Sequence, residues 1–217
     1  MGSKFIGMIS ILLITFFTIL ATYCIYKPDT ETVKLAETTV YIITSTGLGS
    51  GVYLGNGIVL TAYHVVKDAE EIKIQTTNDE PFRASTGPNG HSVSILWTST
   101  QYDVALLEMD YKNVKVSTVA CQAPEVGSDV EAIGQPYGIH FIHKWGKVAG
   151  KPIVFKSGLV GMPVDITIAP GMSGGPLFDK NHQVVGISDM MISDSEKPGF
   201  VSFMVPGSAI CKLLAKR

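Results

Sequence analysis

From Thr38 onward, short runs of apolar and β-branched residues alternate with clusters of turn residues. This pattern is typical of an all-β barrel or sandwich. A first group of predicted strands comprises residues 39–44, 49–54, 58–62, 71–76, 82–86, 93–97 and 104–109. After a linker, a second group comprises residues 129–134, 141–149, 153–156, 158–163, 177–179, 184–189 and 200–205. The tail from Gly207 to Arg217 places Ile210, Leu213 and Leu214 at helical spacing, which predicts a closing helix.

The N-terminal segment 5–26 contains no charged residue. At about 1.5 Å per residue, the stretch from Ile6 to Ile25 would span about 30 Å as a helix, the thickness of a bilayer core. A bulky tyrosine, Tyr23, stands where a cleavable signal peptide needs a small residue. We therefore predict that residues 5–26 cross the lipid bilayer once. Lys4 flanks this segment on its N-terminal side, whereas Asp29 and Glu31 dilute the charge on the other side, which favours an extracytoplasmic position for the rest of the chain.

Net charge bears on nucleic-acid binding, and chain length bears on the number of domains. Residues 1–27 hold two bases and no acid, so the remainder has 15 bases and 19 acids, a net charge of −4. A nucleic-acid partner is therefore not expected. We predict an anchor at 1–27 and a polar tether at 28–37, and 217 residues leave room for one further unit of two small halves. Oligomeric state has no signal in the sequence.

Three short motifs suggest nucleophilic catalysis. Residues 171–177 read Gly-Met-Ser-Gly-Gly-Pro-Leu and place Ser173 on a glycine turn. A hydroxyl is a weak nucleophile, so it needs a base within hydrogen-bond reach and a third group that orients the base. His64 ends one apolar strand, and Asp103 begins another. Each residue alone could be an ordinary strand-end or turn residue, but their combination with these flanking sequences predicts a catalytic triad.

In this order, the three motifs resemble those of the chymotrypsin-fold serine proteases. Within that fold, four further stretches resemble the HtrA/Deg branch, and the resemblance covers about residues 47–206. These stretches are Gly-Leu-Gly-Ser-Gly-Val at 47–52, Ala-Ile-Gly-Gln-Pro-Tyr-Gly at 132–138, Asp165, and Pro-Gly-Met-Ser at 170–173. One departure from the branch is that no extension of the size of a PDZ domain follows the protease region.

The resemblance implies two antiparallel six-stranded β-barrels, at 38–122 and 123–217, with a C-terminal helix. It implies a serine endopeptidase acting on polypeptides, in which Ser173 attacks, His64 is the base and Asp103 orients the imidazole. The amides of Gly171 and Ser173 would form the oxyanion hole. The alternative is a catalytically silent module that retains this fold to bind peptides at the membrane.

The resemblance also indicates the specificity pocket. Its base would lie six residues before the serine, at Thr167, and its wall would come from Ile187 and Ser188. Because no acid occupies the base, we expect a small or medium apolar substrate side chain rather than Arg or Lys. Asp189 follows this wall directly, and the sequence does not reveal where its side chain points.

Metals, cofactors and cysteines are the remaining questions. His140 and His143 lack a nearby acid or cysteine at ligand spacing, so we expect no metal, and no cofactor motif is present. Cys121 and Cys211 could be bridged if the closing helix packs near the linker, as the resemblance implies, but two buried free thiols are favoured.

In digestive members of the fold, the residue before the nucleophile is an aspartate that pairs with a newly cut N-terminus. Met172 stands there in this chain, which predicts that no activating cleavage is needed.

Overall fold

The computed structural model describes residues 34–79, 90–193 and 200–215, and the account below concerns residues 35–215 within these ranges. The predicted membrane segment 5–26, most of the tether 28–37 and the predicted strand 82–86 lie outside the described residues. Within the described ranges, no helix has both the length and the apolar character needed to cross a membrane.

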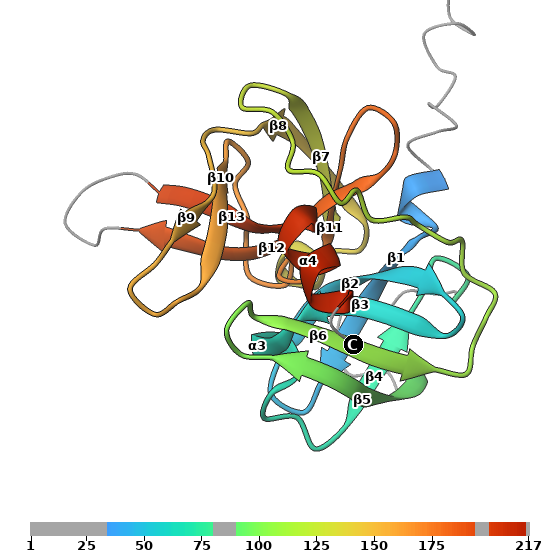
Figure 1. Ribbon diagram of the computed structural model, residues 1–217. Coiled ribbons are helices and arrows are strands. Elements are labelled where there is room, and N and C mark those ends of the chain that lie inside the picture. Colours follow the sequence, from blue (N-terminus) through green and yellow to red (C-terminus); the bar gives the residue numbers. More distant parts are fainter. Residues whose placement is uncertain (1–33, 80–89, 194–199, 216–217) are drawn as a thin grey trace, which may run out of the picture. The chain divides into compact units, whose positions relative to one another are not determined.

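The first half is a closed six-stranded barrel, as predicted, with neighbours in the order β1-β2-β3-β6-β5-β4 (Figure 1). All pairs are antiparallel. The strands are β1 (Thr39–Thr44), β2 (Leu48–Gly55), β3 (Ile58–Ala62), β4 (Ile72–Gln75), β5 (His91–Ser99) and β6 (Val104–Met109). A single helical turn, α3 (Tyr63–Val66), follows β3 directly. Apolar side chains that alternate along these strands fill the barrel, because successive residues of a strand point to opposite faces.

The second half differs from the prediction, because a closed six-stranded barrel is wrong here. Seven strands form one sheet in the order β8-β7-β11-β12-β13-β10-β9. They are β7 (Asp129–Gly134), β8 (Ile142–Lys147), β9 (Ile153–Val154), β10 (Val160–Val164), β11 (Pro176–Phe178), β12 (Val184–Ser193) and β13 (Phe200–Pro206), and a 3-10 turn, η1 (Pro136–Gly138), lies between β7 and β8.

The two ends of this sheet approach each other over only a few residues. Val148 and Val164 form an isolated antiparallel bridge, and the amide of Asp165 donates to the carbonyl oxygen of Lys147 at 2.8 Å. Gly146 permits the approach, because a Cβ atom there would lie 2.1 Å from the carbonyl oxygen of Asp165. The short β9 extends the sheet beside β10. The sheet therefore curls into a half-barrel.

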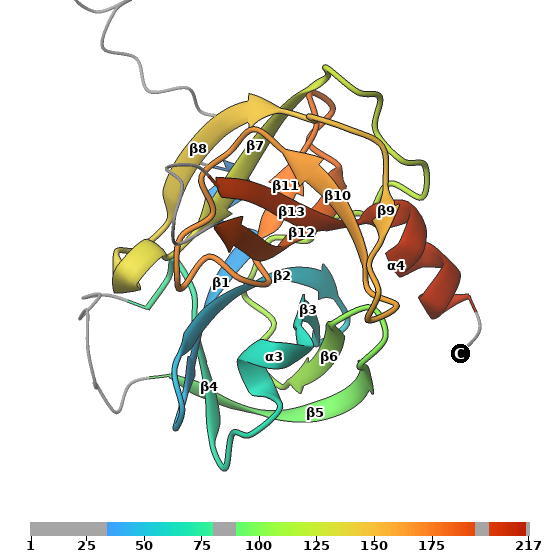
Figure 2. The same cartoon turned by 90° about the vertical axis from the view of Figure 1, so that its left-hand side faces the viewer.

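The C-terminal helix α4 (Gly207–Leu214) is present as predicted and packs against β12 and β13 (Figures 1 and 2). It joins a core cluster that spans both halves. Val52, Leu60 and Leu106 of the barrel share this cluster with Phe178 and Ile210. Burying these side chains stabilises the two halves as one unit, since each fully buried aliphatic or aromatic side chain contributes roughly 1.5–3 kcal/mol.

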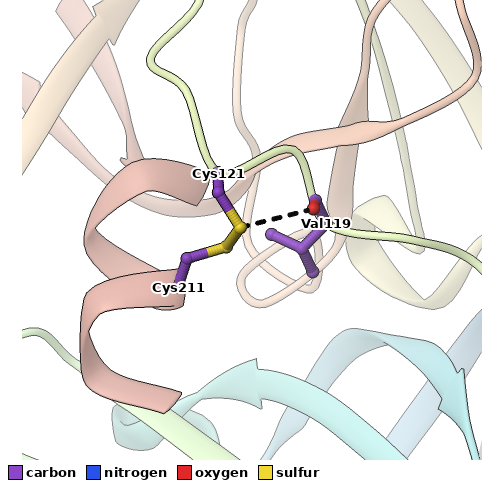
Figure 3. Close-up of a disulfide and its surroundings, with 3 residues drawn as sticks. All are labelled: Val119, Cys121 and Cys211. Carbon is purple, nitrogen blue, oxygen red and sulfur yellow. Dashed lines mark hydrogen bonds between the residues drawn. A yellow bond between two sulfur atoms is a disulfide. The ribbon is translucent and has the colours of Figure 1, made fainter. Parts of the chain in front are cut away.

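A disulfide joins the linker between the halves to this helix (Figure 3). Cys121 and Cys211 are bonded, with Cα atoms 5.4 Å apart. The favoured interpretation as two buried free thiols is therefore wrong, and Cys121 is exposed. The reason is tertiary: packing of α4 brings residue 211 to within bonding range of a residue 90 positions earlier.

Candidate active site

The first part of the site is a histidine held by an aspartate. β3 ends at Ala62, and α3 turns the chain so that His64 faces Asp103, which immediately precedes β6. Asp103 accepts three hydrogen bonds: its carbonyl oxygen from the amide of Tyr63 (3.0 Å), its Oδ1 from the amide of His64 (2.8 Å), and its Oδ2 from His64 Nδ1. Because the same carboxylate binds both the backbone and the ring, the position and the orientation of the imidazole are fixed together.

Asp103 has a left-handed backbone, with φ of 51°. Aspartate tolerates this region better than most residues, but it still carries some strain. The three hydrogen bonds to Asp103 compensate for that strain and direct the side chain toward α3.

The second part of the site is the loop that carries Ser173. Gly171 has φ of 94°, and a Cβ atom there would lie 2.2 Å from the carbonyl oxygen of Gln135. Only glycine fits such a position. Ser50, on β2, fixes the loop from the other half: its Oγ lies 2.7 Å from the carbonyl oxygen of Gly171, and its amide donates to the carbonyl oxygen of Ser173 at 2.8 Å.

These contacts leave the candidate oxyanion hole available. Within the described part of the chain, the amides of Gly171 and Ser173 donate to no backbone carbonyl oxygen. The Ser173 hydroxyl donates to the carbonyl oxygen of Asp189 at 3.3 Å and, among the described residues, makes no hydrogen bond to His64. A rotation about the side-chain bond of Ser173 would therefore have to precede proton transfer to His64.

Asp189 is the residue that sequence reasoning left undecided. Between β12 and β13 the pairing shifts from Ser188↔Met204 to Met191↔Ser202, so two residues of β12 lie opposite one residue of β13. Such a bulge re-aims side chains and is common near active sites. Here it coincides with an Asp189 side chain that is buried, 4% exposed, and has a carboxylate oxygen within 4.8 Å of one of Asp103. No sequence signal indicates this bulge.

The three ionisable groups influence one another. Burial, the largest effect, lowers the pKa of His64, but the hydrogen bond and charge of Asp103 and the charge of Asp189 outweigh it, so the pKa is raised. Burial, the largest effect, would raise the pKa of Asp103. The side-chain hydrogen bond and charge of His64, followed by the interactions with the Asp189 side chain and the His64 backbone amide, outweigh burial and lower this pKa. Burial, then the hydrogen bond and charge of Asp103, raise the pKa of Asp189 to about 7.

The predicted pocket residues occupy different environments. Thr167 is exposed and lines a cavity of about 610 Å³ with Lys144 and Asp165, and the Nζ of Lys144 donates to the Thr167 carbonyl oxygen at 2.8 Å. The side chain of Ile187 is fully buried in the core that both halves share. Ser188 is also buried, and its hydroxyl lies 2.6 Å from the carbonyl oxygen of Met172. The structure therefore leaves Thr167, but not the other two side chains, accessible to a substrate.

Two groups of side chains could be considered for metal binding. His140 packs edge-on against the Tyr41 ring, whereas His143 Nδ1 lies 2.6 Å from Glu131 Oε1, so these histidines have separate partners. Metal-binding atoms of His64, Asp103 and Asp189 lie within 4.8 Å of one another. Of these three, His64 and Asp103 already hydrogen-bond each other through His64 Nδ1 and Asp103 Oδ2, two of the atoms that a metal would need.

Comparison with known proteins identifies the type of domain. The family model described as a trypsin-like peptidase domain matches residues 49–187. A probable periplasmic serine endoprotease, DegP-like, from Pseudomonas putida is 34% identical over 163 residues, which are 73% of this chain and 32% of that protein. Protease Do-like 1, chloroplastic, from Arabidopsis thaliana is 29% identical over 170 residues, covering 74% of this chain and 37% of that protein.

Solved structures agree on the fold. An inactive form of the Mycobacterium tuberculosis protein Rv3671c superposes with a TM-score of 0.70 at 19% identity, covering 89% of this chain and 92% of that one. A serine endoprotease from Yersinia pestis gives a TM-score of 0.69 at 24% identity, covering 85% of this chain and 65% of that one. The chain spans about a third of the length of the curated relatives that it matches.

Proposed function

Because the chain belongs to the trypsin-like peptidase domain family, we propose that it is a serine endopeptidase of the HtrA/Deg type that hydrolyses polypeptides through Ser173, His64 and Asp103. The observation that carries this proposal is that Asp103 binds both the backbone amide and the ring of His64, while the Ser173 hydroxyl donates to Asp189, whose side chain lies within 4.8 Å of both. The predicted resemblance to chymotrypsin-fold proteases is confirmed at the level of the family.

In the proposed reaction, Asp103 holds the proton on His64 Nδ1, so that Nε2 is the basic nitrogen. The Ser173 hydroxyl turns from the Asp189 carbonyl oxygen toward Nε2, loses its proton and attacks the peptide carbonyl carbon. The protonated His64 then gives the proton to the leaving amine, and water hydrolyses the acyl-enzyme by the same steps. The amides of Gly171 and Ser173 stabilise the oxyanion, each contributing roughly 3 kcal/mol.

A second candidate is a catalytically silent binding module, which the hydrogen bond from Ser173 to the Asp189 carbonyl oxygen favours. Labelling of the full chain by a fluorophosphonate distinguishes the two. We expect the parent and the exposed control Ser94→Ala to be labelled and to cleave casein, and Ser173→Ala to do neither. Equal labelling of Ser173→Ala, or an inert parent, would contradict the proposed enzyme.

For specificity, we propose a small or medium apolar side chain next to the scissile bond. The Asp189 carboxyl faces Asp103, so the acid nearest to the predicted pocket wall is engaged elsewhere. Mass spectrometry of the casein fragments tests this, and cleavage mainly after Arg or Lys would contradict it.

We also propose that residues 5–26 anchor the protease in a membrane with the catalytic unit outside the cytoplasm. Two observations support this placement: a disulfide, which persists in oxidising compartments, and curated relatives whose names include periplasmic proteases. We expect the full chain in the membrane fraction of bacterial cells, with the catalytic unit digested when protease is added to spheroplasts. Protection of the unit, or a soluble product with a new N-terminus near residues 21–26, would contradict this.

A further inference from the structure

The acidic side chains of Asp103 and Asp189 lie next to each other beside His64. If both carboxylates were charged, they would repel each other. Asp103 is 8% exposed and Asp189 is 4% exposed. The second oxygen of Asp189, Oδ2, is buried and has no hydrogen-bond partner among the described residues. A buried carboxylate needs partners for its charge, and two carboxylates at one site share a proton more easily than they both ionise.

The two members of the pair have different surroundings. Asp103 accepts hydrogen bonds from the backbone and ring of His64, so its oxygens are the better acceptors of the pair. Asp189 has no donor of this kind within the described residues. The shared proton therefore belongs on Asp189, whose hydroxyl then points at the Asp103 carboxylate.

We propose that Asp189 is a positioning residue of the catalytic site, which in its neutral, protonated form donates a hydrogen bond to Asp103 and so holds Asp103 against His64. This inference rests on the proposed function, because it assigns Asp189 a task in the same reaction. The Asp189 carbonyl oxygen separately accepts the Ser173 hydroxyl, a contact that must break before Ser173 can reach His64.

A dependence on pH follows from the groups that face Asp189. Asp103 and His64 act directly on the pKa of Asp189. The charge of Lys67 lowers the pKa of His64, whereas the charges of Asp103 and Asp189 raise it. Thr100 and Leu159, which complete the cleft of about 440 Å³ around these side chains, do not titrate. When Asp189 loses its proton, Asp103 loses a donor and His64 faces a second negative charge, which favours the protonated imidazole that cannot act as a base.

The activity test compares Asp189→Asn, Asp189→Ala and the exposed control Asp110→Asn in the full chain, using kcat and KM for a peptide from pH 5 to 9. Asparagine keeps a donor that does not titrate. We expect Asp189→Asn to match the parent near pH 6 and to exceed its kcat/KM about tenfold at pH 8, one unit above the ionisation of Asp189. We expect Asp189→Ala to lose at least tenfold in kcat near pH 6, where Asp189 of the parent is protonated, with little change in KM, and to approach the parent at pH 8 and above. Asp110→Asn should follow the parent at every pH.

A parent-like pH profile of Asp189→Asn would overturn the inference while leaving the proposed function intact. A second measurement decides the matter even for an inactive chain. The raised pKa of Asp189 means that its contribution to stability is complete below its ordinary pKa and is lost as the pH rises through about 7. We therefore expect Asp189→Asn and the parent to have similar Tm at pH 4 and the variant to have the higher Tm at pH 8. A Tm difference that does not change with pH would overturn the proposal.

Discussion

At the scale of single residues, Asp103 links the backbone of the site to its chemistry. Its carbonyl oxygen and Oδ1 bind the first amides of α3, and Oδ2 binds the ring of His64. Its positive φ would strain most residues, but asparagine tolerates it nearly as well as aspartate. Asparagine at this position therefore removes the charge with little change in the backbone.

We predict that Asp103→Asn lowers kcat by roughly 10⁴-fold, because the amide favours the wrong tautomer of His64. Removing the negative charge also lowers the pKa of His64, since the hydrogen bond and charge of Asp103 are what raise it. Steady-state kinetics and an NMR titration of the His64 ring measure both effects, with Asp110→Asn as the control. A variant that retains a tenth of the parental kcat would contradict the assigned role of Asp103.

The sequence predicted the residues whose flanks carry a motif and missed those whose roles depend on distant neighbours. His64, Asp103 and Ser173 stand in recognisable strand-end and glycine-turn motifs. The structure joins His64 to Asp103 and places the Ser173 hydroxyl on Asp189, while the triad itself stays a prediction. The direction of Asp189 depends on a bulge between β12 and β13. Bulges arise from strand pairing, which no local pattern reveals.

At the scale of elements, strand positions followed the apolar pattern closely. β1, β3, β6 and β7 begin and end at the predicted residues. The turn α3 was missed because its sequence, Tyr-His-Val-Val, continues the apolar strand before it, and because its hydrogen-bond acceptor, Asp103, lies 39 residues away from His64. The second half was predicted to close as a barrel, but closure depends on contacts between β8 and β10 rather than on the pattern of either strand.

The disulfide is the element-scale feature with the largest expected effect on stability. It links the inter-half linker to α4 and closes a segment of 90 residues. In the chain-entropy model, such a bridge contributes about 4 kcal/mol to the free energy of unfolding. We predict that Cys211→Ser lowers that free energy by about this amount, as measured by denaturant unfolding without reductant.

Two controls accompany this measurement. The parent in the presence of reductant should be destabilised to a similar extent, and Cys24→Ser, which changes the third cysteine, should leave the effect of reductant unchanged. A Cys211→Ser variant as stable as the parent would show that the bridge contributes little in solution.

At the scale of the whole molecule, the two halves together set the shape of the candidate oxyanion hole. On the barrel, the Ser50 hydroxyl contacts the carbonyl oxygen of Gly171, and the Ser50 amide donates to the carbonyl oxygen of Ser173. In the other half, Gln135 follows β7, and its backbone amide donates to Ser50 Oγ at 3.2 Å. Met172 is fully buried in the core of the second half. The loop is therefore fixed by contacts inside the folded unit, and no charged group at position 172 is available to pair with a new N-terminus.

The chain ahead of the barrel is also packed without a cut. Leu35 is buried in the core that both halves share, and the Thr38 hydroxyl donates to the Leu35 carbonyl oxygen at 2.8 Å. Residues 30–39 contain no basic residue followed by Ile or Val and glycine, the junction that activating cleavage uses in digestive members of the fold. Because Leu35 already belongs to the core of the uncut chain, a cut after it would remove a buried side chain.

We therefore predict that the uncut chain is active. Titration of active sites, combined with intact-mass analysis of the same sample, should give a titre that matches the concentration of uncleaved protein. Ser50→Ala should lower kcat and destabilise the chain by about 1–3 kcal/mol without any cleavage, because it leaves the Gly171 carbonyl oxygen without its donor. Ser94→Ala, an exposed serine on β5, is the matched control. Activity that rises only in step with cleavage before Val40 would show instead that a new N-terminus, and not the contact between Ser50 and Gly171, forms the oxyanion hole.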